Sequence, residues 1–248
     1  LRFTLPMIIG SLLQQCYNIA DTLIVGQCIG SGALAAVGSA YTLMVFLISI
    51  LLGLSMGSGT VFSLQYGAGR MKALRRSIYV SAVLIGTVTI VLNIAALSFI
   101  HPILKLLQIP DDIYQMMYDY LWIIFWGIGF TFIYNFYAAL LRAIGNAVTP
   151  LYFLAISVVL NIGLDLFFIL LLDWGIKGAA IARIIAQGVS ALGIMGYTYA
   201  KCPELRLHRN DLHFDRHCLK EITSFSTLTC IQQSVMNLGI LMVQGLVN

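Results

Sequence analysis

Charged residues are scarce in this chain of 248 residues: they make up 10% of the sequence, while hydrophobic residues make up 60%. Soluble domains contain roughly 25% charged residues, so the scarcity excludes an ordinary soluble fold. A membrane-spanning helix needs about 20 apolar residues, and suitable runs occur at residues 3–27, 37–66, 77–100, 115–141, 151–172, 178–200 and 221–247. Because these runs are continuous rather than alternating, they predict helices. We therefore expect an all-α membrane protein with a six-helix bundle followed by a seventh helix.

Metal-binding and redox patterns are also lacking. The five cysteines show no CxxC or His-partnered spacing, which excludes the usual zinc and thiol motifs. Three of the four histidines (His208, His213 and His217) lie among arginines and lysines that would repel a cation. We expect no metal site there and no cofactor.

A cleavable signal peptide is missing as well, because the first apolar run is too long and no A-x-A-like site follows it. The chain starts at Leu1 rather than Met and stops at Asn248, where the seventh apolar run ends. We therefore expect it to be a piece of a longer protein.

The few positive charges are unevenly distributed. With the N-terminus in the cytoplasm, the cytoplasmic segments hold eleven Lys and Arg residues, whereas the external segments hold only Lys105 and Lys177. The positive-inside rule therefore predicts a cytoplasmic N-terminus. The basic clusters are interpreted as topology signals and not as a nucleic-acid site.

The composition changes abruptly at residues 201–220, which are rich in charge. This segment predicts a cytoplasmic linker between a transmembrane lobe at residues 1–200 and the start of a second lobe at residues 221–248. A weak internal repeat supports the division, because residues 12–27 and 230–245 both contain a Gln pair followed by an Asn. Many transporters are built from such repeats.

The first apolar run carries a polar stripe. Asp21 shares one helical face with Gln14, Tyr17 and Asn18. Charged groups at membrane depth usually face a bundle interior or a watery cavity, so the stripe predicts a lined cavity. The alternative is that these side chains join helices by hydrogen bonds.

The fifth apolar run has a second polar stripe, formed by Ser157, Asn161 and Asp165 one turn apart. Asn161 can hydrogen-bond Asp165 in either protonation state, which favours Asp165 as a proton carrier. The alternative is a structural aspartate paired with a neighbouring helix.

Two further runs contribute polar residues to the same interior. These are Thr131 and Asn135 in the fourth run and Gln187 in the sixth. Arg183, also in the sixth run, is expected to extend toward the external interface. The alternative is that it pairs with Asp21 or Asp165.

Small and helix-breaking residues mark two more features. Gly53 and Gly57 have the spacing that permits close helix packing. Pro6 marks a helix start or, alternatively, a hinge.

Three stretches resemble the multidrug and toxic compound extrusion (MATE) transporters: LPMIIGSLLQQCYNIADTLIVGQCIGSGALAAVG at 5–38, GNAVTPLYFLAISVVLNIGLDLFFIL at 145–170 and WGIKGAAIA at 174–182. The resemblance covers the whole chain as the N-terminal lobe of a twelve-helix fold plus the first helix of the C-terminal lobe. The chain is most similar to the DinF-like bacterial subfamily.

The resemblance implies a cation site at Asp21, Asn161 and Asp165, helped by Asn135, and a hinge at Pro6. Na⁺ is a possible occupant of the first three residues. Arg183 departs from the family pattern, which often has a small hydroxyl residue there. A permanent cation at this position disfavours Na⁺ coordination more than proton binding.

The implied function is secondary active efflux of drugs, with lipophilic cations exchanged for H⁺ or Na⁺, in the bacterial cytoplasmic membrane. The expected partners are drugs, membrane lipids and a C-terminal lobe, and no enzymatic activity is implied. Gln14, Tyr17, Asn18, Thr131 and Gln187 are expected to line the substrate cavity.

Three alternatives stay open. A flippase for lipid-linked intermediates would usually need several cationic residues, and this lobe offers Arg183. An intramembrane aspartyl protease also places two aspartates on separate spans, but Ala20 precedes Asp21 and the second stretch is NIGLD, so the usual protease motifs are missing. A complete protein of this length would have to dimerise to build a cavity or else be non-functional.

Overall fold

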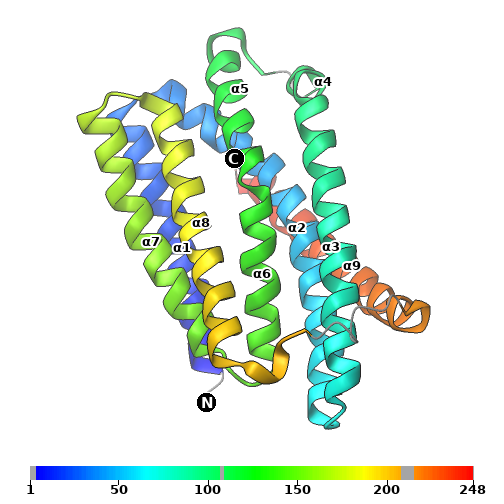
Figure 1. Cartoon of the computed structure of the whole chain (residues 1–248). Coiled ribbons are helices and arrows are strands. Elements are labelled where there is room, and N and C mark those ends of the chain that lie inside the picture. The colour runs from blue at the N-terminus through cyan, green and yellow to red at the C-terminus, as the bar shows by residue number, and fades with distance from the viewer. Residues whose placement is uncertain (1–3, 107–108, 208–214, 248) are drawn as a thin grey trace.

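The computed structural model describes residues 4–106, 109–207 and 215–247, and the secondary structure within these ranges is helical (Figure 1). The helices are α1 (Thr4–Cys28), α2 (Ser31–Gly67), α3 (Met71–Ser98), α4 (Ile100–Leu106), α5 (Asp111–Trp126), α6 (Ile128–Ala143), α7 (Val148–Leu166), α8 (Gly175–Lys201) and α9 (Arg216–Val247). A π-helical turn, η1 (Phe167–Leu171), extends α7, and a 3-10 turn, η2 (Pro203–Leu205), follows α8. Each expected apolar run is therefore helical in the described residues.

Membrane-spanning character is clearest in α2, α3, α7 with η1, and α8, which are long and apolar enough to cross a bilayer. If the bent pair α5 and α6 is counted as one span, the candidate spans in the described residues rise from four to five. The other two expected spans correspond to α1 and α9, with 25 and 32 residues. Polar residues, among them Gln14, Asn18 and Asp21, lower the mean hydropathy of α1.

The fourth expected span is broken rather than continuous. The chain bends by 46° between α5 and α6, at Gly127. A Cβ added to Gly127 would lie 2.8 Å from Cγ1 of Ile184 on α8, so the break fits closely against α8. The side-chain amide of Asn93 on α3 donates to the carbonyl of Phe125 and so satisfies a backbone group at the break.

The bundle packs around α2, which contacts α3, α5, α6 and α9, while α7 and α8 pack together and α1 lies against α7. Phe62 on α2 and Phe136 on α6 are buried in this core with their rings edge to face at 6.0 Å. Large apolar side chains are exposed on the outer surfaces, including Leu12 on α1, Ile90 on α3 and Val159 on α7. Exposed apolar surface of this extent suits contact with lipid.

Helix α9 crosses behind α2 in Figure 1 and contacts it through small residues. A Cβ added to Gly53 would lie 2.7 Å from the Cα of Cys230, and one added to Gly57 would lie 2.4 Å from the Cα of Ser226. The hydroxyl of Ser226 donates to the carbonyl of Leu54 at 3.3 Å. The predicted role of Gly53 and Gly57 in close helix packing is confirmed.

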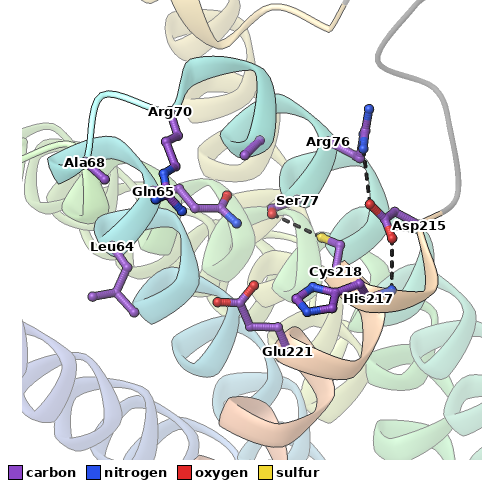
Figure 2. A pocket seen from close by; sticks show the side chains of 11 residues that line it. Leu64, Gln65, Ala68, Arg70, Arg76, Ser77, Asp215, His217, Cys218 and Glu221 are labelled. Atoms are coloured by element: carbon purple, nitrogen blue, oxygen red, sulfur yellow. Dashed lines mark hydrogen bonds and ion pairs between the residues drawn. The ribbon is translucent and has the colours of Figure 1, made fainter.

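The start of α9 is tied to α3 at the end of the bundle predicted to be cytoplasmic. The carboxylate of Asp215 accepts from the backbone N–H of His217 at 2.9 Å and pairs with Arg76 at 3.1 Å, and Ser77 lies 3.1 Å from the thiol of Cys218. Figure 2 shows these contacts beside a cavity of about 270 Å³. Helix α9 thus begins at Arg216 rather than 221.

Residues 208–214, with His208 and His213, lie outside the described residues. The division into a lobe at 1–200, a linker at 201–220 and a second lobe from 221 stays a prediction.

Candidate functional site

The candidate site begins with one face of α1. Tyr17, Asp21 and Val25, spaced four residues apart, are the buried residues of this helix. Asn18 is half-buried beside them, whereas Gln14 is exposed. Of the predicted stripe, Tyr17 and Asp21 therefore face the interior of the bundle, whereas Gln14 faces outward.

Arg183 on α8 turns toward Asp21. Its Nη1 atom lies 3.4 Å from Oδ2 of Asp21 and 3.4 Å from the hydroxyl of Tyr120 on α5, and its guanidinium carbon lies 5.4 Å from the centre of the Tyr17 ring. The expectation that Arg183 extends to the external interface is wrong. Arg183 lies two turns inside α8, about 12 Å from the helix start at 1.5 Å per residue, and a carboxylate, a hydroxyl and an aromatic face surround it there.

The polar stripe of α7 is buried as well. Ser157, Asn161 and Asp165 all face the interior, and Asn161 and Asp165 are 0% exposed. The polar side-chain atoms of Asn161 and Asp165 have no hydrogen-bond partner within the described residues. The expected hydrogen bond between Asn161 and Asp165 is therefore not formed, although the two residues share a face. Asp165 is close enough to both Asp21 and Arg183 to interact electrostatically with them.

A cavity of about 360 Å³ adjoins the Asp21–Arg183 pair. Helices α1, α2, α5 and α8 line it, and its polar lining includes Asn18, Asp21, Tyr41, Tyr120 and Arg183. The remaining lining is largely apolar, with Ile19, Leu23, Val37 and Met44. Such a cavity suits an amphipathic molecule that carries one or two polar groups.

Gln14, Tyr17, Asn161 and Asp165 are not part of this cavity lining, and four other predicted residues also lie outside it. Asn135 and Thr131 are half-buried, and the Asn135 amide donates to the carbonyl of Thr131 in its own helix at 2.8 Å. Gln187 is half-buried on α8. Pro6 is half-buried in the first turn of α1 as described, where its missing N–H removes no intrahelical bond. The predicted hinge at Pro6 and the predicted roles of the other three residues stay predictions.

The sequence did not single out Tyr120 and Tyr41, which line the cavity from α5 and α2. Tyr120 is 2% exposed, and a buried tyrosine hydroxyl usually has a polar partner. A tyrosine in the middle of an apolar run is the signal that could have found it. Elsewhere in the described ranges, no three His, Cys, Asp or Glu side chains gather as a metal site would require.

A bundle of apolar helices that buries Asp21 beside a cavity and Asp165 on a neighbouring helix is typical of a membrane transport protein, because ionisable groups at membrane depth mark ion and substrate paths. The chain belongs to the MatE family, whose family model matches residues 6–167. Proteins of this family are multidrug efflux transporters, which supports a non-enzymatic role.

Two curated relatives illustrate the similarity. The chain is 35% identical over 190 residues to the probable multidrug resistance protein YpnP of Bacillus subtilis, covering 77% of this chain and 43% of the relative. It is 28% identical over 248 residues to the probable multidrug resistance protein NorM of Thermotoga maritima, covering 98% of this chain and 53% of the relative. The chain thus spans about half the length of the relatives it matches.

A solved structure shares the fold. It is described as the outward-facing conformation of a multidrug resistance MATE family transporter, and it matches with a TM-score of 0.90 at 24% identity over 97% of this chain and 53% of that chain. At this identity the likeness shows the fold alone, which places the helices of this chain in half of a MATE transporter fold.

Proposed function

We propose that this chain forms the N-terminal half of a secondary active transporter that exchanges lipophilic organic cations for H⁺ or Na⁺ by alternating access. The observation that carries the proposal is the state of Asn161 and Asp165, which are buried without a hydrogen-bond partner in the described part of the chain. A lone carboxylate in such a place must be neutralised by a proton or a cation. The coupling ion and a cationic drug would therefore compete for one negative group.

The cavity beside Asp21 supports the choice of substrate. Its lining is mostly apolar and includes the rings of Tyr41 and Tyr120, which suit a flat organic cation. Ile19, Leu23 and Tyr41 are exposed on this side of the lobe. A C-terminal lobe packed over these residues would close the cavity into a central binding site.

The relatives support the same class of cargo, since those reported above are named as probable multidrug resistance proteins. They are bacterial, which supports a place in the bacterial cytoplasmic membrane. Drugs, membrane lipids and a C-terminal lobe are the proposed partners, and H⁺ or Na⁺ is the proposed coupling ion.

The test replaces Asp165 by Asn in the full-length protein and measures ethidium efflux from vesicles, with pH and Na⁺ gradients imposed separately. Asp165→Asn removes the exchangeable charge but keeps the shape of the side chain, so we expect coupled efflux to be lost while the protein stays folded. Asp119→Asn is the matched control, because Asp119 pairs with Lys177 away from the cavity lining, at 3.2 Å. Undiminished coupled efflux by Asp165→Asn would contradict the proposal.

A further inference from the structure

We infer that Arg183 is a built-in counter-ion that removes Asp21 from ion exchange, so that Asp165 alone exchanges a proton for a monovalent organic cation, one for one. The inference rests on the proposed function and assigns its stoichiometry.

The geometry of the Asp21–Arg183 pair carries the inference. The two charged groups lie 3.4 Å apart, with side-chain exposures of 5% and 21%. The guanidinium also contacts the Tyr120 hydroxyl and lies over the Tyr17 ring, so three helices hold it beside Asp21. Because an arginine side chain does not lose its proton in proteins, its charge is permanent and balances that of Asp21.

Asp165 is in a different position, since no hydrogen bond or ion pair of its carboxylate is found within the described residues. The charged groups that act on it are Asp21 from α1 and Arg183 from α8. Two titratable groups of α6 lie elsewhere. Tyr134 donates to the carbonyl of Pro150, at the end of α7 opposite to Asp165, and Arg142 lies in the last turn of α6. Arg183 is paired with Asp21, which leaves Asp165 as the carboxylate of the site that has no ion pair within the described residues.

The coupling ion follows from the same geometry. A Na⁺ ion needs several oxygen ligands, and Asp21 already faces a fixed cation that would repel Na⁺. A proton needs only one carboxylate oxygen. The site therefore exchanges H⁺ rather than Na⁺.

The stoichiometry has an electrical consequence. Exchange of one proton for one monovalent cation moves no net charge across the membrane, so the membrane potential neither drives nor opposes it. The pH gradient alone then sets the limit, at about tenfold accumulation of substrate per pH unit.

The experiment compares three variants of the full-length protein: Asp21→Asn, the double variant Asp21→Asn with Arg183→Met, and the control Asp119→Asn with Lys177→Met. Binding of tetraphenylphosphonium to purified protein is measured against pH and Na⁺ concentration. Uptake into vesicles is measured with the pH gradient and the potential set independently. The control pair joins α5 to α8, so it shares α8 with the Asp21–Arg183 pair but does not line the cavity.

We expect Asp21→Asn to weaken binding at least tenfold, because Arg183 then repels the cation. The double variant should restore binding, and its Kd should rise about tenfold per pH unit on acidification, as in the unmodified protein. The control pair should behave like the unmodified protein, Na⁺ should not compete, and exchange should not respond to the potential.

Three results would overturn the inference: a double variant that folds but binds no better than Asp21→Asn, a Kd that changes about a hundredfold per pH unit in the unmodified protein, or exchange driven by the potential. If the double variant does not fold, the last two measurements on the unmodified protein still decide. If the unmodified protein shows no exchange, the proposed function is rejected. Binding in detergent requires no transport, so the number of protons displaced per bound cation would still show whether Arg183 removes Asp21 from ion exchange.

Discussion

The contact between α2 and α9 makes a strong prediction for the variant Gly57→Ala. The added Cβ would lie 2.4 Å from the Cα of Ser226, whereas carbon atoms in contact are about 3.5–4.0 Å apart. Because the obstructing atom belongs to the backbone, no side chain can rotate away. Helix α9 would therefore have to retreat by about 1 to 1.5 Å.

Overpacking of this kind costs about 1–3 kcal/mol, while alanine gains up to about 1 kcal/mol over glycine in a helix. Gly38→Ala is the matched control on the same helix, since nothing lies within 4 Å of its added Cβ, and it should show the gain alone. We expect Gly57→Ala to be less stable than Gly38→Ala by about 1–3 kcal/mol, or roughly 2–4 °C of melting temperature for each kcal/mol. Thermal unfolding of both purified variants in detergent measures the difference, and equal melting temperatures would refute the close contact.

Two further variants test contacts in other parts of the bundle. Asn93→Leu leaves the Phe125 carbonyl at the α5–α6 break without its side-chain donor, so thermal unfolding should show a loss of about 1–3 kcal/mol; an unchanged melting temperature would contradict this role. At the start of α9, the backbone N–H of His217 and the guanidinium of Arg76 hold the pKa of Asp215 below its usual range. The ionised Asp215 therefore stabilises the fold above its usual pKa of about 3.9, and this stabilisation disappears as the pH falls through the lower pKa of the folded state. Asp215→Asn should unfold with a weaker dependence on acid pH than the unmodified protein, and identical pH profiles would argue against the contact.

The sequence predicted the helices well, because long apolar runs have few other structures available in a membrane. It also placed Tyr17 and Asp21 on one buried face, and Asn161 and Asp165 on another, since helical periodicity determines which residues share a face. The break at Gly127 was not predicted. A glycine in an apolar run is compatible with a straight helix, and the bend depends on the contacts of Gly127 with Ile184 and of Phe125 with Asn93.

Partners on different helices could not be predicted in the same way. Arg183 lies near enough to the external end of α8 for its long side chain to extend toward the interface or into the bundle. It extends into the bundle because Asp21 on α1 and Tyr120 on α5 both lie within reach of its guanidinium there. The exposure of Gln14 could not be predicted either, and its role in a substrate cavity stays a prediction. Gln14 shares the approximate face of Asp21, but the neighbouring helices do not cover that part of α1.

The crossing of α2 and α9 also affects biosynthesis. Ser226 and its acceptor Leu54 are 172 residues apart in the chain, so at about 5–20 residues per second the α2 segment is made about 10 to 35 s before its partner. During that interval the face around Gly53 and Gly57 must stay in the bilayer without α9. Glycines at these two positions are compatible with this delay. They carry no polar side chain that would lie unpaired in lipid, and no bulky side chain that would have to move before α9 packs against α2.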